Sequence, residues 1–393
     1  MKSKHAALPI FLAFLAMGFG DAVGPFVGLA REKFQLSNFM AQLIPFVGFL
    51  MFGLLSIPMG VYQDRKGKKF ILILGLVIML SGLLIPTVMG FSTFPFFLVT
   101  IVLLGAGATT LQVAGNPIMR DVSPEGKYAR NLTLGQFVKA IGSLSGPLIP
   151  VIAARVFGVS WQVIFPIYSV ALMVTIAVLL PLKVNEHSEG HRPVSFASAL
   201  GLLKNGYVAL MVVAIFLYVG AEVSVSSGIP LYLKDRFAID ISRSGLLGTG
   251  LFFLALTIGR FSGGIVLNWV QSSTLLLITC ALSILGLVGI MTNNPSVAMI
   301  CVFLIGLGFA NIFPLVFSMA VDHMPEQANA ISGLMVTAIV GGAVVPPIMG
   351  LVADKFESTQ IAFLVPLIAI LYITATALAN RGTKATKTDP AAV

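Results

Sequence analysis

Three formally charged side chains fall inside apolar stretches long enough to cross a membrane: Asp21, Lys139 and Glu222. Each costs about 2.5–3.5 kcal/mol at the centre of a membrane helix, so each needs a compensating role. Asp21 and Lys139 form either a static ion pair that fixes packing or a pair that opens or takes a proton during a working cycle. Lys139 could also receive an anionic group from a ligand. Glu222 is either a neutral acid that is hydrogen-bonded between helices or a second carboxylate that titrates or binds a cation.

Uncharged polar residues lie near these charges in the sequence. Gln112 and Lys139 each lie about seven residues from the same end of neighbouring apolar stretches, which predicts a similar depth in the membrane. A spacing of three and four residues places one polar, small-residue face on the second stretch, and we expect it to line a central cavity. Its members are Gln136, Lys139, Gly142, Ser143 and Gly146.

Two asparagines come shortly before prolines in the interior of apolar stretches: Asn116 before Pro117, and Asn311 before Pro314. A proline removes a backbone donor and kinks a helix, which frees a carbonyl group. Each asparagine therefore either contacts a ligand or caps the helix break. Tyr218, four residues before Glu222, could stack on a ring-shaped ligand.

The composition identifies the elements that hold these residues. Charged residues make up 10% of the 393 residues and hydrophobic residues 57%, whereas a soluble domain has about 25% charged residues. About 20 apolar residues cross a bilayer as a helix. The sequence predicts an all-α membrane protein with twelve spans, at about 8–30, 39–62, 70–91, 95–119, 132–154, 161–183, 206–232, 244–268, 273–291, 296–321, 328–353 and 359–379.

The basic residues predict the orientation of these spans. With both termini in the cytoplasm, the inner side receives 16 of the 24 Lys and Arg residues, Arg260 among them, and the outer side receives 7. This excess agrees with the positive-inside rule, so the net charge of +9 reflects topology and does not indicate a nucleic-acid partner. Cys280 and Cys301 are expected to be buried, reduced thiols, and no metal site is expected from the sequence.

A polar segment and an internal repeat divide the chain into two halves. The polar stretch 184–204 predicts a cytoplasmic linker between two six-helix bundles, 1–183 and 205–380, with a cytoplasmic tail at 381–393. Short motifs recur between the halves at offsets of 202, 201 and 198 residues, for example Gly105 and Gly107 against Gly306 and Gly308. Two homologous six-helix halves are typical of transporters with a site near the bilayer midplane.

The loop between the second and third spans resembles the signature G-x-x-x-D-R-x-G-[RK]-[RK] of the major facilitator superfamily. We expect its glycine at position 60 to let two helices approach, its aspartate to accept from a helix N-terminus, and its basic cluster to hold the loop at the cytoplasmic face. The loop would then act as a cytoplasmic gate through Gly60, Asp64, Arg65, Gly67 and Lys68.

A narrower resemblance runs from the first span to the end of the eleventh. The runs that begin at Gly105, Asn131, Tyr218, Asn311 and Ala338 resemble the fucose:proton symporter family, which includes bacterial glucose/galactose carriers and sodium-dependent glucose carriers. The resemblance implies that a family carboxylate matches Asp21 and a family glutamine matches Gln136.

Two departures from that family bear on ion coupling. Proton-coupled members have a glutamate where this chain has Gln112, and fucose carriers have an asparagine where it has Lys139. The resemblance therefore leaves the coupling ion open between H⁺ and Na⁺, with Na⁺ possible near Asp21 or Glu222. It also leaves a neutral or an acidic sugar, such as a sialic acid or a uronate, open as the substrate.

Together the residues and the resemblance imply a secondary active transporter that takes up a monosaccharide with a cation by alternating access. It would work as a monomer in the inner membrane of a bacterium, with a sugar and the lipid bilayer as partners and without a cofactor. A membrane enzyme is disfavoured, because the sequence contains no HExxH, GxSxG or phosphate-loop motif. A membrane sensor that binds a sugar without moving it is the other alternative.

Overall fold

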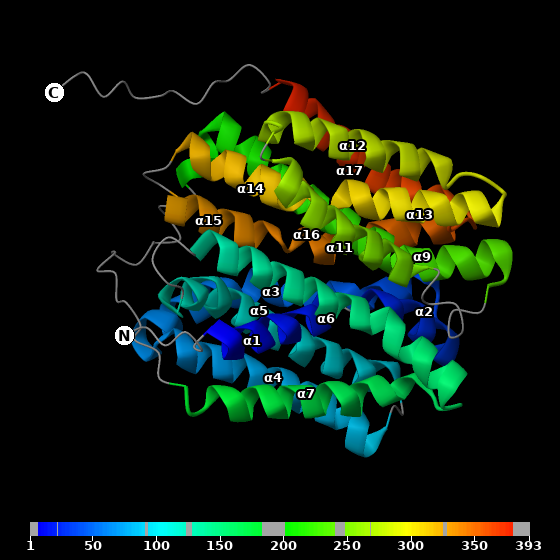
Figure 1. Ribbon diagram of the computed structural model, residues 1–393. Coiled ribbons are helices and arrows are strands. Elements are labelled where there is room, and N and C mark those ends of the chain that lie inside the picture. The colour runs from blue at the N-terminus through cyan, green and yellow to red at the C-terminus, as the bar shows by residue number, and fades with distance from the viewer. Residues whose placement is uncertain are drawn as a thin grey trace.

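The computed structural model describes residues 7–21, 23–90, 93–122, 128–182, 201–239, 248–267, 269–324 and 328–379. The described chain is built of helices (Figure 1), which confirms the predicted fold class. In chain order the helices are α1 (Ala7–Asp21), α2 (Val23–Phe34), α3 (Asn38–Lys66), α4 (Lys68–Met89), α5 (Phe94–Val122), α6 (Tyr128–Val156), η1 (Trp161–Val163), α7 (Ile164–Leu179), η2 (Leu202–Lys204), α9 (Gly206–Phe237), α11 (Thr249–Val266), α12 (Ser272–Gly289), α13 (Pro295–Phe309), α14 (Ile312–His323), α15 (Ala328–Ala338), α16 (Gly341–Lys355), η4 (Ile361–Phe363) and α17 (Leu364–Ala379).

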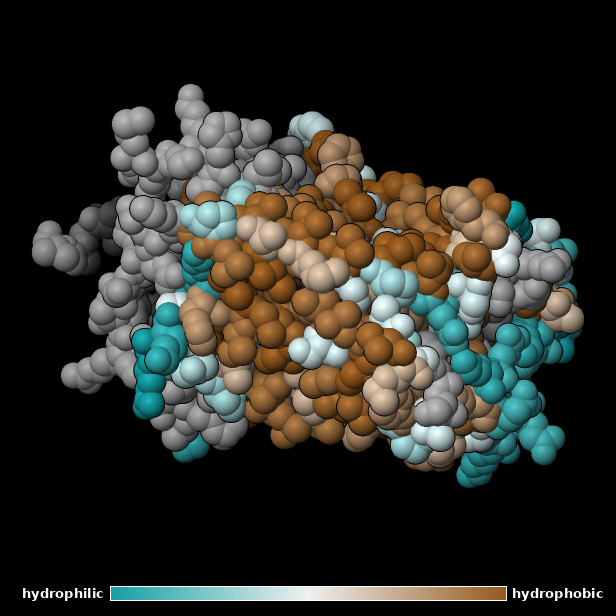
Figure 2. Space-filling view, turned by 90° about the horizontal axis from the view of Figure 1, so that it is seen from below, coloured by the Kyte–Doolittle hydropathy of each residue, from teal (hydrophilic) through white to brown (hydrophobic). Residues whose placement is uncertain are grey.

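Within the described residues, 11 helical segments are long and apolar enough to cross a membrane, and a shorter apolar helix covers Pro9–Gly20. These segments coincide with the twelve spans expected from the sequence. Hydrophobic side chains form a broad belt around the face shown in Figure 2. Large apolar side chains point outward from several helices, among them Met173, Leu285 and Ile368, as a lipid environment allows.

The first span expected from the sequence is described as α1 and α2, on either side of residue 22. The tenth span is interrupted between Phe309 and Ile312, with Pro314 four residues after Ala310. By contrast, α5 continues through 116–117, so the proline there does not end the helix.

Helices α1 to α7 lie on one side of the molecule and α9 to α17 on the other (Figure 1). Glycine contacts show that the two groups are packed alike. A Cβ atom at Gly18 would meet the carbonyl of Lys139, and one at Gly142 that of Leu15, so α1 and α6 touch backbone to backbone. In the second group, a Cβ atom at Gly341 would meet the carbonyl of Phe216, which joins α9 to α16.

The repeated glycines of the fourth and tenth spans also have equivalent partners. A Cβ atom at Gly105 would meet the backbone of α3 at Gly48, whereas one at Gly306 would meet the backbone of α11 at Phe252. The contacts therefore recur at offsets of about 200 residues, in agreement with the internal repeat in the sequence.

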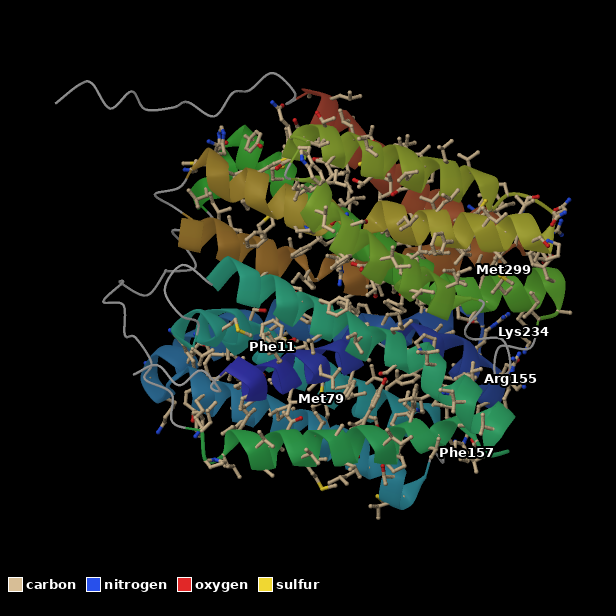
Figure 3. The ribbon with its side chains drawn as sticks, viewed as in Figure 1. Phe11, Met79, Arg155, Phe157, Lys234 and Met299 are labelled. Carbon is tan, nitrogen blue, oxygen red and sulfur yellow. The ribbon has the colours of Figure 1, made fainter. Side chains whose placement is uncertain are left out.

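The start of α1 and the end of α17 lie at one end of the bundle, which we call the proximal end, and the opposite end is the distal end (Figure 1). Arg155 and Lys234, both expected on the outer side, lie together at the distal end (Figure 3). Hydrophilic side chains also gather there (Figure 2). The two groups of helices contact each other through α3 and α16, α6 and α11, and α2 and α9.

Candidate functional site

In the first group of helices, the structure brings together the predicted Gln112 and Lys139. The Lys139 Nζ atom donates to Gln112 Oε1 over 3.3 Å. Gln112 lies ten residues before the end of α5 and Lys139 lies eleven after the start of α6, which accounts for their common depth. Both side chains are half-buried, as is Gln136, almost one helical turn before Lys139 on α6. The equal depth predicted for Gln112 and Lys139 is confirmed.

Asp21 enters this site through its backbone position. It is the last residue of α1, three residues beyond Gly18, whose Cα faces the carbonyl of Lys139. The side chains of Asp21 and Asn116 lie outside the described residues, so their predicted roles stay predictions.

The small residues of α6 have a different role from the one expected. Gly142 packs against the backbone of α1, and Ser143 Oγ donates to the carbonyl of Lys139 on its own helix. This part of the polar face is therefore a helix–helix contact rather than the wall of a cavity. Sequence spacing defines the face of a helix but not the element that covers it.

In the second group, Glu222 has a partner that the sequence had placed elsewhere. The Arg260 Nη2 atom lies 3.5 Å from Glu222 Oε1, and the two side chains are 24% and 20% exposed. The sequence interpretation counted Arg260 among the basic residues of the inner side. It lies instead within α11, six residues before its end, so a fourth charge lies inside the spans. Without Arg260, the inner side has 15 basic residues and the outer side has 7, so the positive-inside bias persists.

Tyr218 and Asn311 lie near this ion pair. The Tyr218 hydroxyl donates to the carbonyl of Phe309 over 2.8 Å, at the interruption of the tenth span. Its ring is fully buried against Phe309 and Phe313, so it offers no face for a sugar to stack on in this conformation. Asn311 is buried and its Nδ2 atom donates to the carbonyl of Gly259 over 2.8 Å. Both side chains thus support the helix break.

The predicted gating loop is a tight turn between α3 and α4. Gly67 has a φ of 89°, a conformation that favours glycine, and its N–H donates to the carbonyl of Gln63. Arg65 lies in the last turn of α3, which ends at Lys66, and Lys68 begins α4. The expectation for Gly60 is wrong in this conformation, because a Cβ atom there would meet nothing within 4 Å. The side chain of Asp64 lies outside the described residues.

At the distal end, polar contacts join the two groups of helices. Both carboxylate oxygens of Asp354, at the end of α16, accept from the first turn of α3: from the Asn38 N–H at 3.0 Å and the Phe39 N–H at 2.8 Å. The Asn38 side-chain amide adds a third bond of 2.7 Å to the same carboxylate. One turn further along α3, the buried Gln42 accepts from Ser227 of α9 over 2.9 Å.

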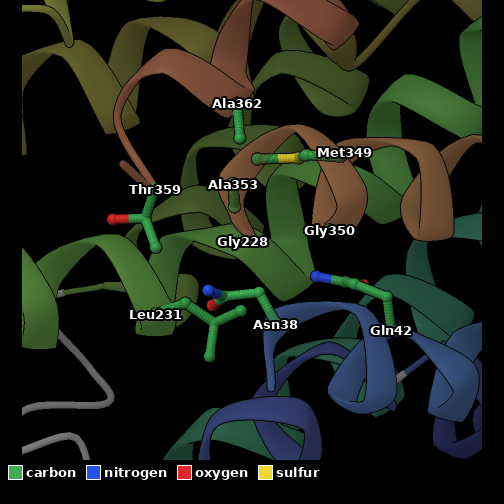
Figure 4. Close-up of a pocket in the computed structure, with 9 residues that line it drawn as sticks. All are labelled: Asn38, Gln42, Gly228, Leu231, Met349, Gly350, Ala353, Thr359 and Ala362. Carbon is green, nitrogen blue, oxygen red and sulfur yellow. The ribbon is translucent and has the colours of Figure 1, made fainter. Parts of the chain in front are cut away.

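Charge pairs extend this distal contact to α2. Arg31 bonds both carboxylate oxygens of Asp235 at 2.9 and 3.1 Å, and Lys234 pairs with Glu32. We call these contacts, with those of Asp354, the distal latch. Next to it lies a small, almost wholly apolar pocket with room for about one water molecule, far too small for a sugar (Figure 4).

Comparison with known proteins gives the family. The sequence matches the Major Facilitator Superfamily over residues 10–347. The chain belongs to the Major Facilitator Superfamily. It is 30% identical to a glucose/galactose transporter of Brucella abortus over 87% of this chain and 86% of the relative. It is 24% identical to the L-fucose-proton symporter of Escherichia coli over 87% and 86%. The predicted resemblance to the fucose:proton symporter family is confirmed.

Solved structures of the superfamily share the fold. The crystal structure of the E. coli fucose:proton symporter aligns with a TM-score of 0.70 at 20% identity, over 97% of this chain and 100% of the other. A bacterial homologue of the lysosomal transporter Spinster, in an inward-facing conformation, aligns with a TM-score of 0.73 at 14% identity, over 96% and 97%. The relatives are transporters rather than enzymes, and this chain is a multi-pass membrane transporter.

Proposed function

We propose that this protein takes up a neutral monosaccharide by proton symport across the cytoplasmic membrane of a bacterium. The observation that supports the proposal best is the similarity to a glucose/galactose transporter along 87% of the chain. The relative named an L-fucose-proton symporter favours H⁺ over Na⁺ as the coupling ion. Two six-helix halves, 1–183 and 205–380, would move against each other, and a monomer would suffice because each chain contains both halves.

The N-terminal half would hold the first coupling centre. Asp21 would take and release the proton, since a carboxylate inside a membrane span is rare and is typical of a proton relay. Lys139 would stabilise the ionised carboxylate when the carrier is empty, while Gln112 holds the ammonium at its depth. The amide oxygen of Gln112 is one acceptor of the Lys139 ammonium, and this contact by itself does not require an acidic sugar. Gln136 and Asn116 remain candidate ligands for the sugar hydroxyl groups.

The orientation follows from the basic residues. With the proximal end in the cytoplasm, the gating loop at Gly67 lies inside and the distal latch lies outside. The latch would then close the path to the exterior in the conformation described above. Uptake requires it to open, so a substrate and a proton entering from outside would bind after the latch has released.

The test is transport by purified protein in proteoliposomes. Labelled glucose, galactose, fucose and a uronate would each be offered under an inward proton gradient, an inward sodium gradient, or neither. Accumulation of a neutral sugar under the proton gradient alone supports the proposal. Accumulation of the uronate only, dependence on sodium only, or binding without counterflow would each refute a separate part of it. The last result would identify a sensor.

A further inference from the structure

Glu222 and Arg260 form an ion pair inside the membrane-spanning region. Glu222 is 16 residues from the start of α9 and 15 from its end, or roughly 23 Å from either. Arg260 reaches it from α11, which also packs against α6 of the other half. Two charges at this depth are retained only where they pair or take part in function.

The surroundings hold this pair in a defined place. Asn311 bonds the carbonyl of Gly259, the residue directly before Arg260, and this fixes α11 beside the interruption of the tenth span. Tyr218, one turn before Glu222, bonds the carbonyl of Phe309 on the other side of that interruption. The helices that carry the acid and the base are thus both hydrogen-bonded to the same break, between α13 and α14.

The titratable groups shown near Glu222 are Arg260 and Tyr218. Other charged residues on the described parts of the helices that pack against α9 lie towards the ends of the bundle. At the distal end these are Arg31, Glu32 and Lys33 of α2 and Asp354 and Lys355 of α16, and at the proximal end they are Arg65 and Lys66 of α3, Lys204 of η2 and His323 of α14.

The internal repeat relates Glu222 to Asp21 by an offset of 201 residues, within the range of the other repeated positions. Each half therefore carries a carboxylate at an equivalent position in its first span. Each half also carries a cation on a helix that contacts the first one, but the helices are not equivalent: Lys139 comes from α6 and Arg260 from α11. The carboxylate position is common to both halves, whereas the counter-charge comes from a different helix in each half.

We infer that Glu222 and Arg260 form a second proton-coupling pair, so that the carrier moves one proton through Glu222 in addition to the one at Asp21. When the pair opens, the Glu222 carboxylate binds a proton from the outer side and becomes a neutral acid. When Arg260 returns on the inner side, the acid releases that proton and the ion pair forms again. The inference rests on the proposed function, and it predicts a proton-to-sugar ratio of two.

The ratio can be measured from the sugar gradient at which net flux stops, in proteoliposomes with a fixed pH difference and membrane potential. The double variant Glu222→Gln/Arg260→Gln removes both charges and leaves no unpaired one. Its rate of sugar counterflow should stay within a few fold of the wild-type rate, while the proton-to-sugar ratio falls by one. The matched control, Arg31→Gln/Asp235→Asn, removes an ion pair of the distal latch and should keep the wild-type ratio.

An unchanged ratio in the Glu222/Arg260 double variant would show that the pair is structural and overturn the inference, while the wild-type result would still support symport. If the double variant does not fold, Arg260→Lys keeps the charge but alters the pair. It should retain a ratio of two with a shifted pH profile, and a wild-type profile there would overturn the inference. A wild-type protein that moves no sugar under any gradient would instead refute the proposed function.

Discussion

The distal latch makes a quantitative prediction at Asp354. Its carboxylate accepts two backbone N–H groups and one amide at 2.7 to 3.0 Å, all from the first turn of α3 in the other half. Ser37 caps the same turn from within its own half, through Met40 N–H at 3.1 Å. In Asp354→Asn, an NH₂ group replaces one of the two carboxylate oxygens and would face the N–H donors of α3 without accepting from them. The substitution also removes the negative charge that interacts favourably with the N-terminus of α3.

The size of the effect follows from these contacts. One charge-assisted hydrogen bond contributes about 1.5–3 kcal/mol, and a charge at a helix N-terminus about 0.3–1 kcal/mol. Partial exposure of Asp354 argues for the lower values, so we expect a loss of about 2 kcal/mol. Because these bonds exist only while the distal end is closed, the ratio of closed to open protein should fall roughly 30-fold.

Spin labels can measure this ratio. Cysteines at Met40 and Phe356, both exposed at the distal end but in different halves, would carry the labels in a background without Cys280 and Cys301. Asp354→Asn should increase the population with a long distance between the labels. The exposed Glu357→Gln is a matched change of carboxylate to amide, and Ser37→Ala weakens α3 within one half; neither should change the ratio. A change below about threefold in Asp354→Asn would show that the latch does not hold the closed state.

Three further predictions concern the membrane-embedded residues. Asp21→Asn should abolish accumulation of sugar against a gradient but preserve counterflow, because exchange needs no change of charge; accumulation by this variant would make Asp21 structural. Lys139→Gln should uncouple sugar transport from the proton gradient or shift the pH dependence of transport, while sugar affinity changes only a few fold. A 10–150-fold loss of affinity confined to acidic sugars would instead mean that the lysine binds a substrate carboxylate. Gly142→Ala should lower the thermal unfolding temperature, because its Cβ atom would meet the carbonyl of Leu15 and overpacking costs about 1–3 kcal/mol. Gly60→Ala should leave the unfolding temperature unchanged, because a Cβ atom at position 60 has open space around it. Equal effects of the two substitutions would contradict the packing described for α1 and α6.

The two buried thiols and the spans show where sequence reasoning succeeds. Cys280 and Cys301 are free and buried, as their apolar surroundings predicted. The spans agree with the twelve apolar stretches because a bilayer selects helices by length and hydrophobicity, both of which are local properties of the chain. The repeat and the turn at Gly67 are also visible in the sequence, since a helix-to-helix turn with positive φ needs a glycine at a fixed position.

The pairing of charges depended on the tertiary structure. Arg260 was assigned to the inner surface from its position in the sequence, and only the approach of α9 to α11 shows that it meets Glu222, 38 residues earlier. The distal latch joins Asn38 to Asp354, which are 316 residues apart, and no local pattern connects them.

The sequence by itself determined the membrane class, the number of spans, the repeat and the family, because each rests on composition or spacing along one segment. Only the tertiary structure decided which polar groups meet, since lipid supplies no partners and every buried charge must find one on another helix. That is why Gln112 and Lys139, predicted at one depth, are seen in contact, whereas the face of α6 that was expected to be open is covered by α1.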